Sequence, residues 1–325
     1  MALRSEFEKA GAYTASPKEA DVILFNSHQL LKETFSLKNN FLEKIFVHRI
    51  DGPVYFYRKS QMYVDKAIFK INQLVADGTV FQSKWSQQEN KKLFGADFAS
   101  DVVILNAANP AIFNRQGRLN FETNRKTRLI SSSWSQNDLK GFDFYCFLDN
   151  NLDFSKYEMI FIGKSPIDFK NIKQTGRVSQ TDLAQLLKQS DVFISASRVE
   201  SCSNALIEAL SCGLPCLAFN SSSNPEVLQG GGELFENEQD LLLKLEKIRQ
   251  NYSHYQNNLP VFSMQKTAHD YLQFMANLCD TIKKPKRIGF WDYLSFLLLQ
   301  MLMLDGRARE KLTPRPPVHY NYNIK

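Results

Sequence analysis

The sequence has few of the residues that build metal sites, disulfide frameworks or membrane spans. Its five cysteines contain no Cys-x-x-Cys pair, so small buried thiols in a reducing compartment are a better interpretation than disulfides or a zinc site. The five histidines are scattered, and no Asp-x-Asp occurs, so the common carboxylate pair that holds a metal–diphosphate complex is absent. We therefore expect no metal site and no cofactor.

The composition is that of an ordinary globular protein with room for two domains. The chain has 325 residues, of which 43% are hydrophobic and 23% charged, and its start is too charged for a signal peptide. The net charge of +6 suits phosphorylated ligands or an anionic membrane face. The sequence contains no basic stretch interleaved with aromatic residues of the kind that indicates nucleic-acid binding. We expect a cytoplasmic protein that binds no nucleic acid.

Strand-like and helix-like segments alternate along the first half of the chain. Such an alternation is typical of a parallel, doubly wound sheet, so the predicted fold class is α/β. The predicted strands are 20–27, 44–50, 79–83 and 102–105, and the predicted helices are 2–11, 29–36, 62–77 and 86–94.

The most informative segment runs from Asp191 to Gly232. A short strand leads through a polar loop to a helix at about 203–212, which stops at Gly213-Leu-Pro before a second strand. Ser203 is a suitable N-cap residue, and the free N–H groups of a helix start form an anion site. Glu200 lies in the loop and Glu208 in the helix. Both follow the carboxyl end of a parallel strand, where open α/β sheets bind their ligands.

A phosphate at this helix start would repel the two carboxylates unless each carboxylate had hydrogen-bond donors of its own. Sugar and ribose hydroxyls are such donors. The pattern therefore fits a ligand that carries phosphate and several hydroxyls, as a nucleotide sugar does. The alternative is a surface helix with two solvated glutamates, which is the more common fate of Glu, and the spacing alone would favour it.

The residues themselves resemble a known family. Glu200-Ser-Cys-Ser-Asn-Ala-Leu-Ile-Glu208, followed by Gly213-Leu-Pro, is similar to the signature of retaining glycosyltransferases of family 4, the group 1 family with the GT-B fold. Asn224-Pro-Glu-Val resembles the family's Pro-Glu-Val segment. The resemblance implies two Rossmann-like domains facing a central cleft. It also implies metal-independent transfer of a sugar from a nucleoside diphosphate to a glycan or lipid-linked acceptor hydroxyl, commonly in surface polysaccharide assembly.

The resemblance implies roles for individual residues. Glu200 would orient the hydroxyls of the donor sugar, and Glu208 would bind those of the ribose. Lys140, followed by Gly141, would offset the diphosphate charge, and His48 would contact the sugar. The predicted catalytic residues are thus Glu200, His48 and Lys140. The remaining predicted donor-binding residues are Gly163, Val178, Ser201, Ser203 and Asn204.

Two parts of the family pattern are missing. The chain starts at what resembles the helix after the family's first strand and Gly-rich loop, and Ser133-Trp-Ser135 stands where an Arg is expected. Two alternatives therefore stay open: an inactive sugar-nucleotide-binding subunit of a glycan-assembly complex or, with less support, a GT-B epimerase. The predicted domains are an acceptor-side domain at 1–122, incomplete at its start, a nucleotide-sugar domain at 123–282, and a C-terminal helix and tail at 283–325.

The C-terminal segment places a basic run beside an apolar one. Four basic residues between 283 and 287 precede residues 288–304, which are mostly apolar but include Asp292. At about 17 residues this run is short for a membrane span. One interpretation is an interfacial helix that makes a peripheral contact with the inner face of the membrane. The other is a helix that packs back on the first domain.

Overall fold

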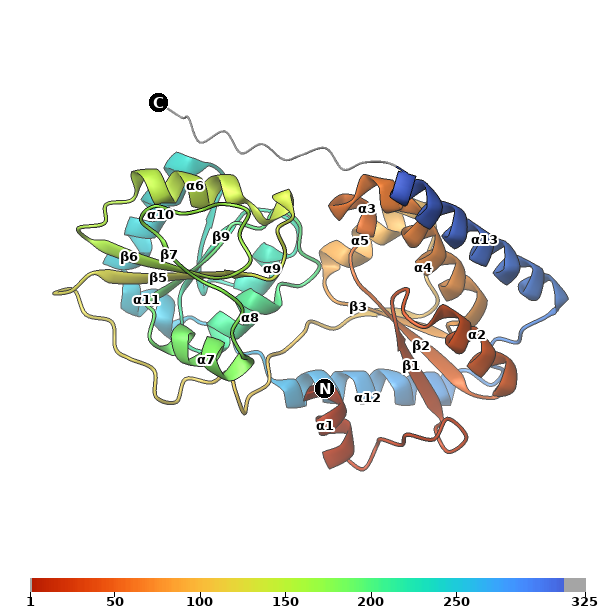
Figure 1. Cartoon of the computed structure of the whole chain (residues 1–325). Helices are drawn as coiled ribbons and strands as arrows, with labels where there is room; N and C mark the ends of the chain where they lie inside the picture. Colours follow the sequence, from red (N-terminus) through yellow and green to blue (C-terminus); the bar gives the residue numbers. More distant parts are fainter. Residues whose placement is uncertain (1, 313–325) are drawn as a thin grey trace. The chain divides into compact units, whose positions relative to one another are not determined.

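The structure is a computed structural model that describes residues 2–312, so the predicted tail from residue 313 onward lies outside the described residues. The chain divides into two compact units. Unit 1 comprises residues 2–105 and 265–312, and unit 2 comprises residues 106–264 (Figure 1). Each unit is built on a parallel sheet with helices on both faces, which confirms the predicted α/β class and the two Rossmann-like domains.

Unit 1 contains a four-stranded parallel sheet in the order β1-β2-β3-β4. Side-chain alternation along β2 sets its two faces, because Phe46 packs with α2 and α4 whereas Ile45 and Val47 pack with α1 and α12. The strands are β1 (Val22–Asn26), β2 (Ile45–Ile50), β3 (Gly78–Phe81) and β4 (Asp101–Val103). The helices are α1 (Ala2–Lys9), α2 (Leu31–Asn40), α3 (Val54–Tyr57), α4 (Met62–Val75), α5 (Lys84–Phe94), α12 (Met264–Thr281) and α13 (Phe290–Leu312).

Two helices from the end of the chain complete unit 1. Tyr271 and Leu278 of α12 are buried in one cluster with Val47 and Val80 of the sheet, so α12 belongs to unit 1. The sequence-based domains had assigned this helix to the nucleotide-sugar domain. An amphipathic pattern shows that a helix has a buried face but not which sheet covers it, and this is why the boundary at 282 differs from the structure. The last helix, α13, runs along the outer side of α4 (Figure 1).

The polar segment before β5 is part of unit 2 rather than a free linker. The N–H of Leu119 donates to the carbonyl of Lys188 at 3.0 Å, and Arg125 pairs with the buried Asp191 at 2.7 Å. These contacts place the division between the units at 105/106, whereas the sequence had suggested 122/123. The segment is polar because its side chains bind polar groups of unit 2. A solvated linker would have the same polar composition, so composition alone does not separate the two cases.

Unit 2 contains a six-stranded parallel sheet in the order β10-β9-β8-β5-β6-β7. Helices α6, α10 and α11 cover one face, and α7, α8 and α9 lie on the other (Figure 1). The strands are β5 (Thr127–Ser133), β6 (Tyr157–Gly163), β7 (Lys173–Thr175), β8 (Val192–Ser195), β9 (Cys216–Phe219) and β10 (Gly232–Phe235). The helices are α6 (Phe142–Asn151), α7 (Gln180–Lys188), α8 (Asn204–Ser211), α9 (Asn224–Leu228), α10 (Glu238–Gln250) and α11 (Tyr252–Asn257). Within residues 2–312, no helix combines the length and the hydropathy needed to cross a bilayer.

Candidate functional site

Two loops meet where the strand order of unit 2 reverses. The chain leaves β5 toward β6 on one side, and it leaves β8 toward β9 on the other, although β5 and β8 are hydrogen-bonded neighbours. The carboxyl ends of such a strand pair form the usual ligand crevice of an open α/β sheet. Residues 134–140 and 196–203 are the two loops at this point, and together they carry half of the predicted donor-binding residues.

The first loop is fixed by its own side chains and by the second loop. Asn137 accepts a hydrogen bond from the N–H of Leu139 at 2.9 Å and so caps a short 3-10 turn that ends at Lys140. The carbonyl of Leu139 accepts from the N–H of Arg198 in the second loop at 2.7 Å. Gly141 has φ +72°, and a Cβ there would lie 2.1 Å from the carbonyl oxygen of Ala196. The loops can approach this closely because residue 141 is a glycine.

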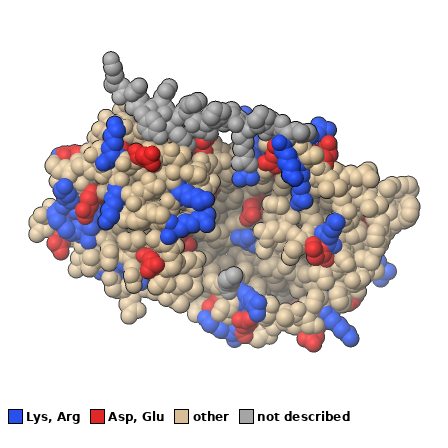
Figure 2. All heavy atoms as spheres, viewed as in Figure 1, with Lys and Arg blue, Asp and Glu red and all other residues tan. Residues whose placement is uncertain are grey.

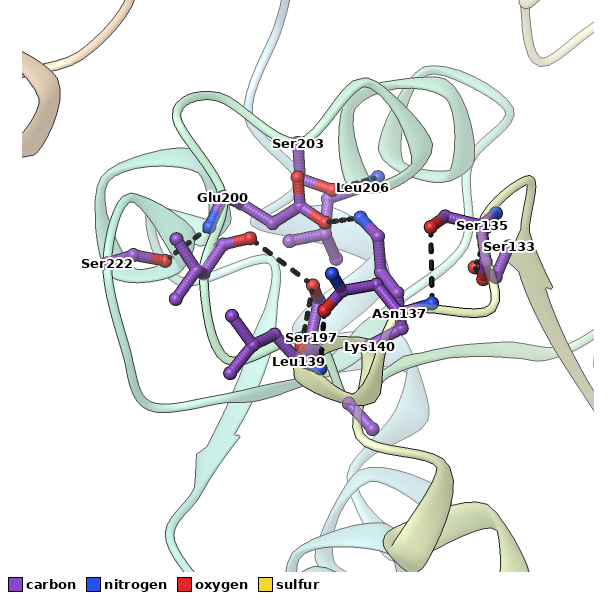
Figure 3. Close-up of polar contacts among 12 residues, drawn as sticks. Ser133, Ser135, Asn137, Leu139, Lys140, Ser197, Glu200, Ser203, Leu206 and Ser222 are labelled. Carbon is purple, nitrogen blue, oxygen red and sulfur yellow. Dashed lines mark hydrogen bonds and ion pairs between the residues drawn. The ribbon is translucent and has the colours of Figure 1, made fainter. Parts of the chain in front are cut away.

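Lys140 and Glu200 form an ion pair across the two loops. The Nζ of Lys140 donates to Oε1 of Glu200 at 2.5 Å, and both side chains are partly buried (Figure 3). The N–H of Glu200 donates to Oγ of Ser222 at 2.9 Å, and the carbonyl of Glu200 accepts from the N–H of Ser223 at 3.3 Å. The Glu200 carboxylate is therefore held in place and neutralised by one cation.

The start of α8 offers backbone donors beside this ion pair. Ser203 is the N-cap, and its Oγ accepts from the N–H of Leu206 at 3.4 Å (Figure 3). Asn204 accepts a side-chain hydrogen bond from Asn106 at 3.0 Å. Among the residues that the structure describes, no acceptor is found for the N–H groups of Asn204 and Ala205. This helix start therefore has the free donors that an anion requires.

Glu208 lies in the second turn of α8 in a different environment. Its side chain is partly buried, and burial raises the pKa of the carboxyl group to about 7. Within the described residues its carboxylate has no hydrogen-bond or ion-pair partner. Because a desolvated carboxylate without donors is unfavourable, a ligand that brings hydroxyl groups would satisfy this side chain.

Gly163 and Val178 lie at the same edge of the sheet. Gly163 is the last residue of β6, has φ +103°, and would place a Cβ 2.1 Å from the carbonyl oxygen of Ser133. The close packing of these two strand ends explains why residue 163 is a glycine, whether or not a ligand binds there. Val178 lies in the loop between β7 and α7, and Ser201 lies in the loop of Glu200. Both positions remain predictions as ligand contacts.

His48 is not part of this cluster, because it lies on β2 in the interior of unit 1. Its ring is fully buried and stacks on Phe25 at 4.2 Å. Nδ1 accepts from the amide of Asn72 at 3.2 Å, so Nε2 is the donor to the carbonyl of Ser27 at 2.9 Å. Burial lowers the pKa of His48 to about 3. The two hydrogen bonds and the stack explain the presence of a neutral histidine at this position without any ligand. We therefore do not include His48 in the proposed donor site.

The expected arginine of the first loop has no counterpart at positions 133–135. The hydroxyl of Ser133 donates to the carbonyl of Ser135 at 2.7 Å, and Trp134 is 43% exposed. Arg198 of the second loop is nearby, but its guanidinium is bound to both carboxylate oxygens of Asp143 at 2.8 and 2.5 Å. Lys140 is therefore the cation that the two loops present beside the helix start.

The structural roles of two residues of the site were not found from the sequence. Ser222, at φ +52°, supports the backbone of Glu200, and the amide of Asn224 donates to the carbonyls of Ser197 and Phe219 at 3.1 and 2.9 Å. Together they tie the loop after β9 to the loop of Glu200. The run Asn220-Ser-Ser-Ser-Asn signals a turn, but it does not show which neighbouring loop the turn would bind.

No group of three or more His, Cys, Asp or Glu side chains is positioned to hold a metal ion in the described part of the chain. The side chains around the helix start are serines, asparagines, one lysine and two separate glutamates, which do not form a set of metal ligands. Metal-independent chemistry therefore stays a prediction that needs a biochemical test.

Comparison with known proteins finds a family match within the chain. Residues 153–251 match the family described as "Glycosyl transferases group 1". An uncharacterized 41.2 kDa protein in the cps region of Klebsiella pneumoniae is 33% identical over 98 residues, which cover 28% of this chain and 27% of that protein. A putative colanic acid biosynthesis glycosyl transferase of Escherichia coli is 32% identical over 135 residues, covering 38% of this chain and 33% of that protein.

The fold of the chain resembles solved structures over a greater length. Anabaena HepE, solved in complex with UDP, has a TM-score of 0.60 at 15% identity, covering 86% of this chain and 81% of that chain. Residues 153–251 thus match the group 1 glycosyltransferases, and the two units have the GT-B fold. The matched segments span about a third or less of the curated relatives' own lengths.

Proposed function

We propose that this chain is a retaining glycosyltransferase. It transfers a sugar from a nucleoside-diphosphate sugar to a hydroxyl of a glycan or lipid-linked acceptor in surface polysaccharide assembly. The observation that supports this most is the juxtaposition, at the reversal point of one sheet, of a helix start with free N–H groups, the Lys140–Glu200 pair and the partnerless Glu208. The relatives that are named for a cps region and for colanic acid biosynthesis support the polysaccharide setting.

Each residue then has a chemical task. The N–H groups of Asn204 and Ala205, together with Lys140, bind the diphosphate, and Lys140 offsets the charge that grows on it as the glycosidic bond breaks. Glu208 accepts hydrogen bonds from the ribose hydroxyls. Glu200 exchanges its bond to Lys140 for hydroxyls of the donor sugar. Ser201, Gly163 and Val178 line the same edge of the sheet and contact the donor.

The reaction needs no separate base in this proposal. The bond between the anomeric carbon and the phosphate oxygen breaks, and the acceptor oxygen bonds to the same face of that carbon. The leaving diphosphate takes the acceptor's proton. Neutralisation by Lys140 and the helix start lowers the free energy of the charged leaving group, and no metal is required.

An inactive donor-binding subunit is the second candidate. The loop at positions 133–135 supports it, because a single lysine stands where the family uses an arginine and a lysine. Such a protein would keep the donor site and lack turnover.

Turnover in the absence of metal tests the proposal. The purified chain is incubated with UDP-, GDP- and ADP-linked sugars in EDTA, and release of nucleoside diphosphate is followed over hours. We expect slow release from one donor, unchanged by added magnesium or manganese. Release that requires a metal would contradict the mechanism, and binding without release would favour the inactive subunit.

A further inference from the structure

Helix α13 packs one face onto unit 1. Phe296, Leu299 and Met303 are buried in one cluster with residues of α2 and α4, and the ring of Phe296 stacks on Phe35 at 3.9 Å. A Cβ at Gly306 would lie 2.3 Å from the ring of Tyr63, so α13 and α4 approach closely there. This agrees with the interpretation that the C-terminal helix packs on the first domain.

Hydrogen bonds at both ends fix the rotation of the helix about its axis. Before the helix begins, the N–H of Lys286 donates to the carboxylate of Asp77 at 2.7 Å. Near its end, Glu310 accepts from Gln61 at 2.7 Å and from the hydroxyl of Tyr63 at 3.0 Å. The direction of the outer face of α13 is therefore set by the fold of unit 1.

That outer face is apolar over most of its length. Eight of the fourteen exposed large hydrophobic side chains in the described residues belong to this one helix. From 290 to 304, every exposed side chain is apolar. Single exposed apolar residues are normal, but a continuous stripe marks an interaction surface. The stripe consists of Phe290, Trp291, Tyr293, Leu294, Leu297, Leu298, Met301 and Leu304.

Basic side chains stand at both ends of the stripe. Lys283, Lys284 and Arg287 are exposed before the helix, and Arg307 and Lys311 are exposed in its last turns. Lys286 does not share this exposure, because its Nζ donates to the carbonyl of Gln73 at 3.0 Å. It therefore contributes to the docking of α13 rather than to the basic patch expected from the sequence. In Figure 2, the part of unit 1 along which α13 runs is mostly tan.

We propose that the outer face of α13 docks unit 1 onto the surface of a bilayer that contains anionic lipids. The helix lies parallel to the surface. The aromatic and aliphatic stripe enters the boundary between headgroups and acyl chains, and the basic ends meet anionic headgroups. Since the opposite face of α13 is packed in unit 1, the helix contacts the bilayer without crossing it.

The basic residues at the ends of α13 favour an anionic bilayer over a second copy of the chain as the partner of the stripe. Two copies pairing through the stripe about a two-fold axis would place a basic end of one helix beside a basic end of the other, whether the helices ran parallel or antiparallel. Residues 283–311 contain seven basic and three acidic residues, so these ends would repel each other. An anionic surface has no such penalty.

Vesicle flotation with the full chain tests the proposal. At low salt, the protein should float with vesicles of phosphatidylcholine mixed with phosphatidylglycerol, and hardly at all with phosphatidylcholine alone. In Trp291→Ser/Leu298→Ser, the bound fraction should fall by about tenfold or more, because two exposed apolar anchors are lost. Lys283→Gln/Lys284→Gln/Arg287→Gln should lose the preference for phosphatidylglycerol. The proposal does not depend on the glycosyltransferase activity, because no nucleotide takes part.

Leu243→Ser/Val261→Ser is the matched control, because these two side chains are exposed to a similar degree but lie in unit 2. This variant should bind vesicles like the parent. Circular dichroism melting confirms that each variant is folded. The proposal is overturned if the parent ignores phosphatidylglycerol vesicles at low salt or if the stripe variant binds as well as the parent. It is also overturned if sedimentation shows a dimer that Trp291→Ser/Leu298→Ser dissociates while the parent binds no vesicles.

Discussion

Glu200 and Glu208 share one sequence signature but differ in electrostatic environment. Glu200 is paired with Lys140 at 2.5 Å, whereas burial without a partner raises the pKa of Glu208 to about 7. A donor must displace the lysine from Glu200, but it can reach Glu208 without breaking a protein contact. We therefore expect Glu208 to contribute to binding of the free nucleotide and Glu200 to contribute mainly when the sugar is present.

The pKa of Glu208 predicts a pH dependence of nucleotide binding. Ribose hydroxyls donate to the ionised carboxylate, so binding favours the deprotonated form. Affinity for the nucleoside diphosphate should rise as the pH increases through about 7 and then level off. Between pH 8 and pH 5.5 the loss should be roughly tenfold or more. Calorimetry on Glu208→Gln provides the control for titration of the phosphate itself, and an equally steep profile in this variant would disprove the assignment.

His48 predicts a pH dependence of stability rather than of catalysis. Its folded pKa of about 3 lies below the ordinary value of about 6.5, so the stability it contributes is present above pH 6.5 and is lost as the pH falls toward 3. Glu208 acts in the opposite sense. Its folded pKa is raised, so stability increases as the pH falls from about 7 to its ordinary value near 4.5. The two effects partly cancel in the parent, and variants are needed to separate them.

His48→Gln should be less stable than the parent at pH 8, because the stack on Phe25 and two buried hydrogen bonds are altered. Its deficit in unfolding free energy should shrink by about 2 kcal/mol between pH 6.5 and 5, since only the parent must keep a buried imidazole neutral. Urea unfolding at several pH values measures this difference. A deficit that stays constant with pH would show that His48 is not held neutral.

At the scale of elements, the strand, loop, helix and strand from β8 to β9 were predictable from the sequence. The contacts that this segment makes with other loops were not. Ser203 as N-cap and Gly213 as the stop are local signals, and the helix begins and ends within a residue or two of the prediction. The ion pair between Lys140 and Glu200 spans sixty positions of sequence and depends on which strands are neighbours. The support from Ser222 depends on a turn whose partner is fixed by packing. Contacts of this kind can be identified only when the fold is known.

Gly141 offers a test of how closely the two loops must approach. Gly141→Ala should cost well over 2 kcal/mol of stability or move the loop of Lys140, because its Cβ would collide with the carbonyl of Ala196. Gly117→Ala is the control, since Gly117 has φ +73° against +72° for Gly141 but nothing within 4 Å of its Cβ. The control should cost about 1 kcal/mol from backbone strain alone. Equal losses in denaturant unfolding would refute the role of this approach.

At the scale of the whole molecule, the sequence predicted two parallel α/β sheets but misplaced the division between them. The helix α12 and the segment 106–126 both mix polar and apolar residues, and this composition does not indicate which sheet each segment packs on. The sheet that each packs on is decided by tertiary contacts, such as Arg125 with Asp191 and Tyr271 with the core of unit 1. For α13, the sequence left packing and membrane contact as alternatives, whereas the structure gives one helix a packed face and an exposed apolar face.

The central claim is that unit 2 binds a nucleoside diphosphate at the start of α8 with Glu208 as the ribose acceptor. Calorimetric titration of UDP, GDP and ADP into the parent, Glu208→Gln and Glu238→Gln tests it most directly, because Glu238 begins α10 on the opposite face of the same sheet. We predict that one nucleotide binds the parent and Glu238→Gln equally and binds Glu208→Gln more weakly by about 1–3 kcal/mol. Failure of all three nucleotides to bind the parent, or equal binding to all three proteins, would contradict the account.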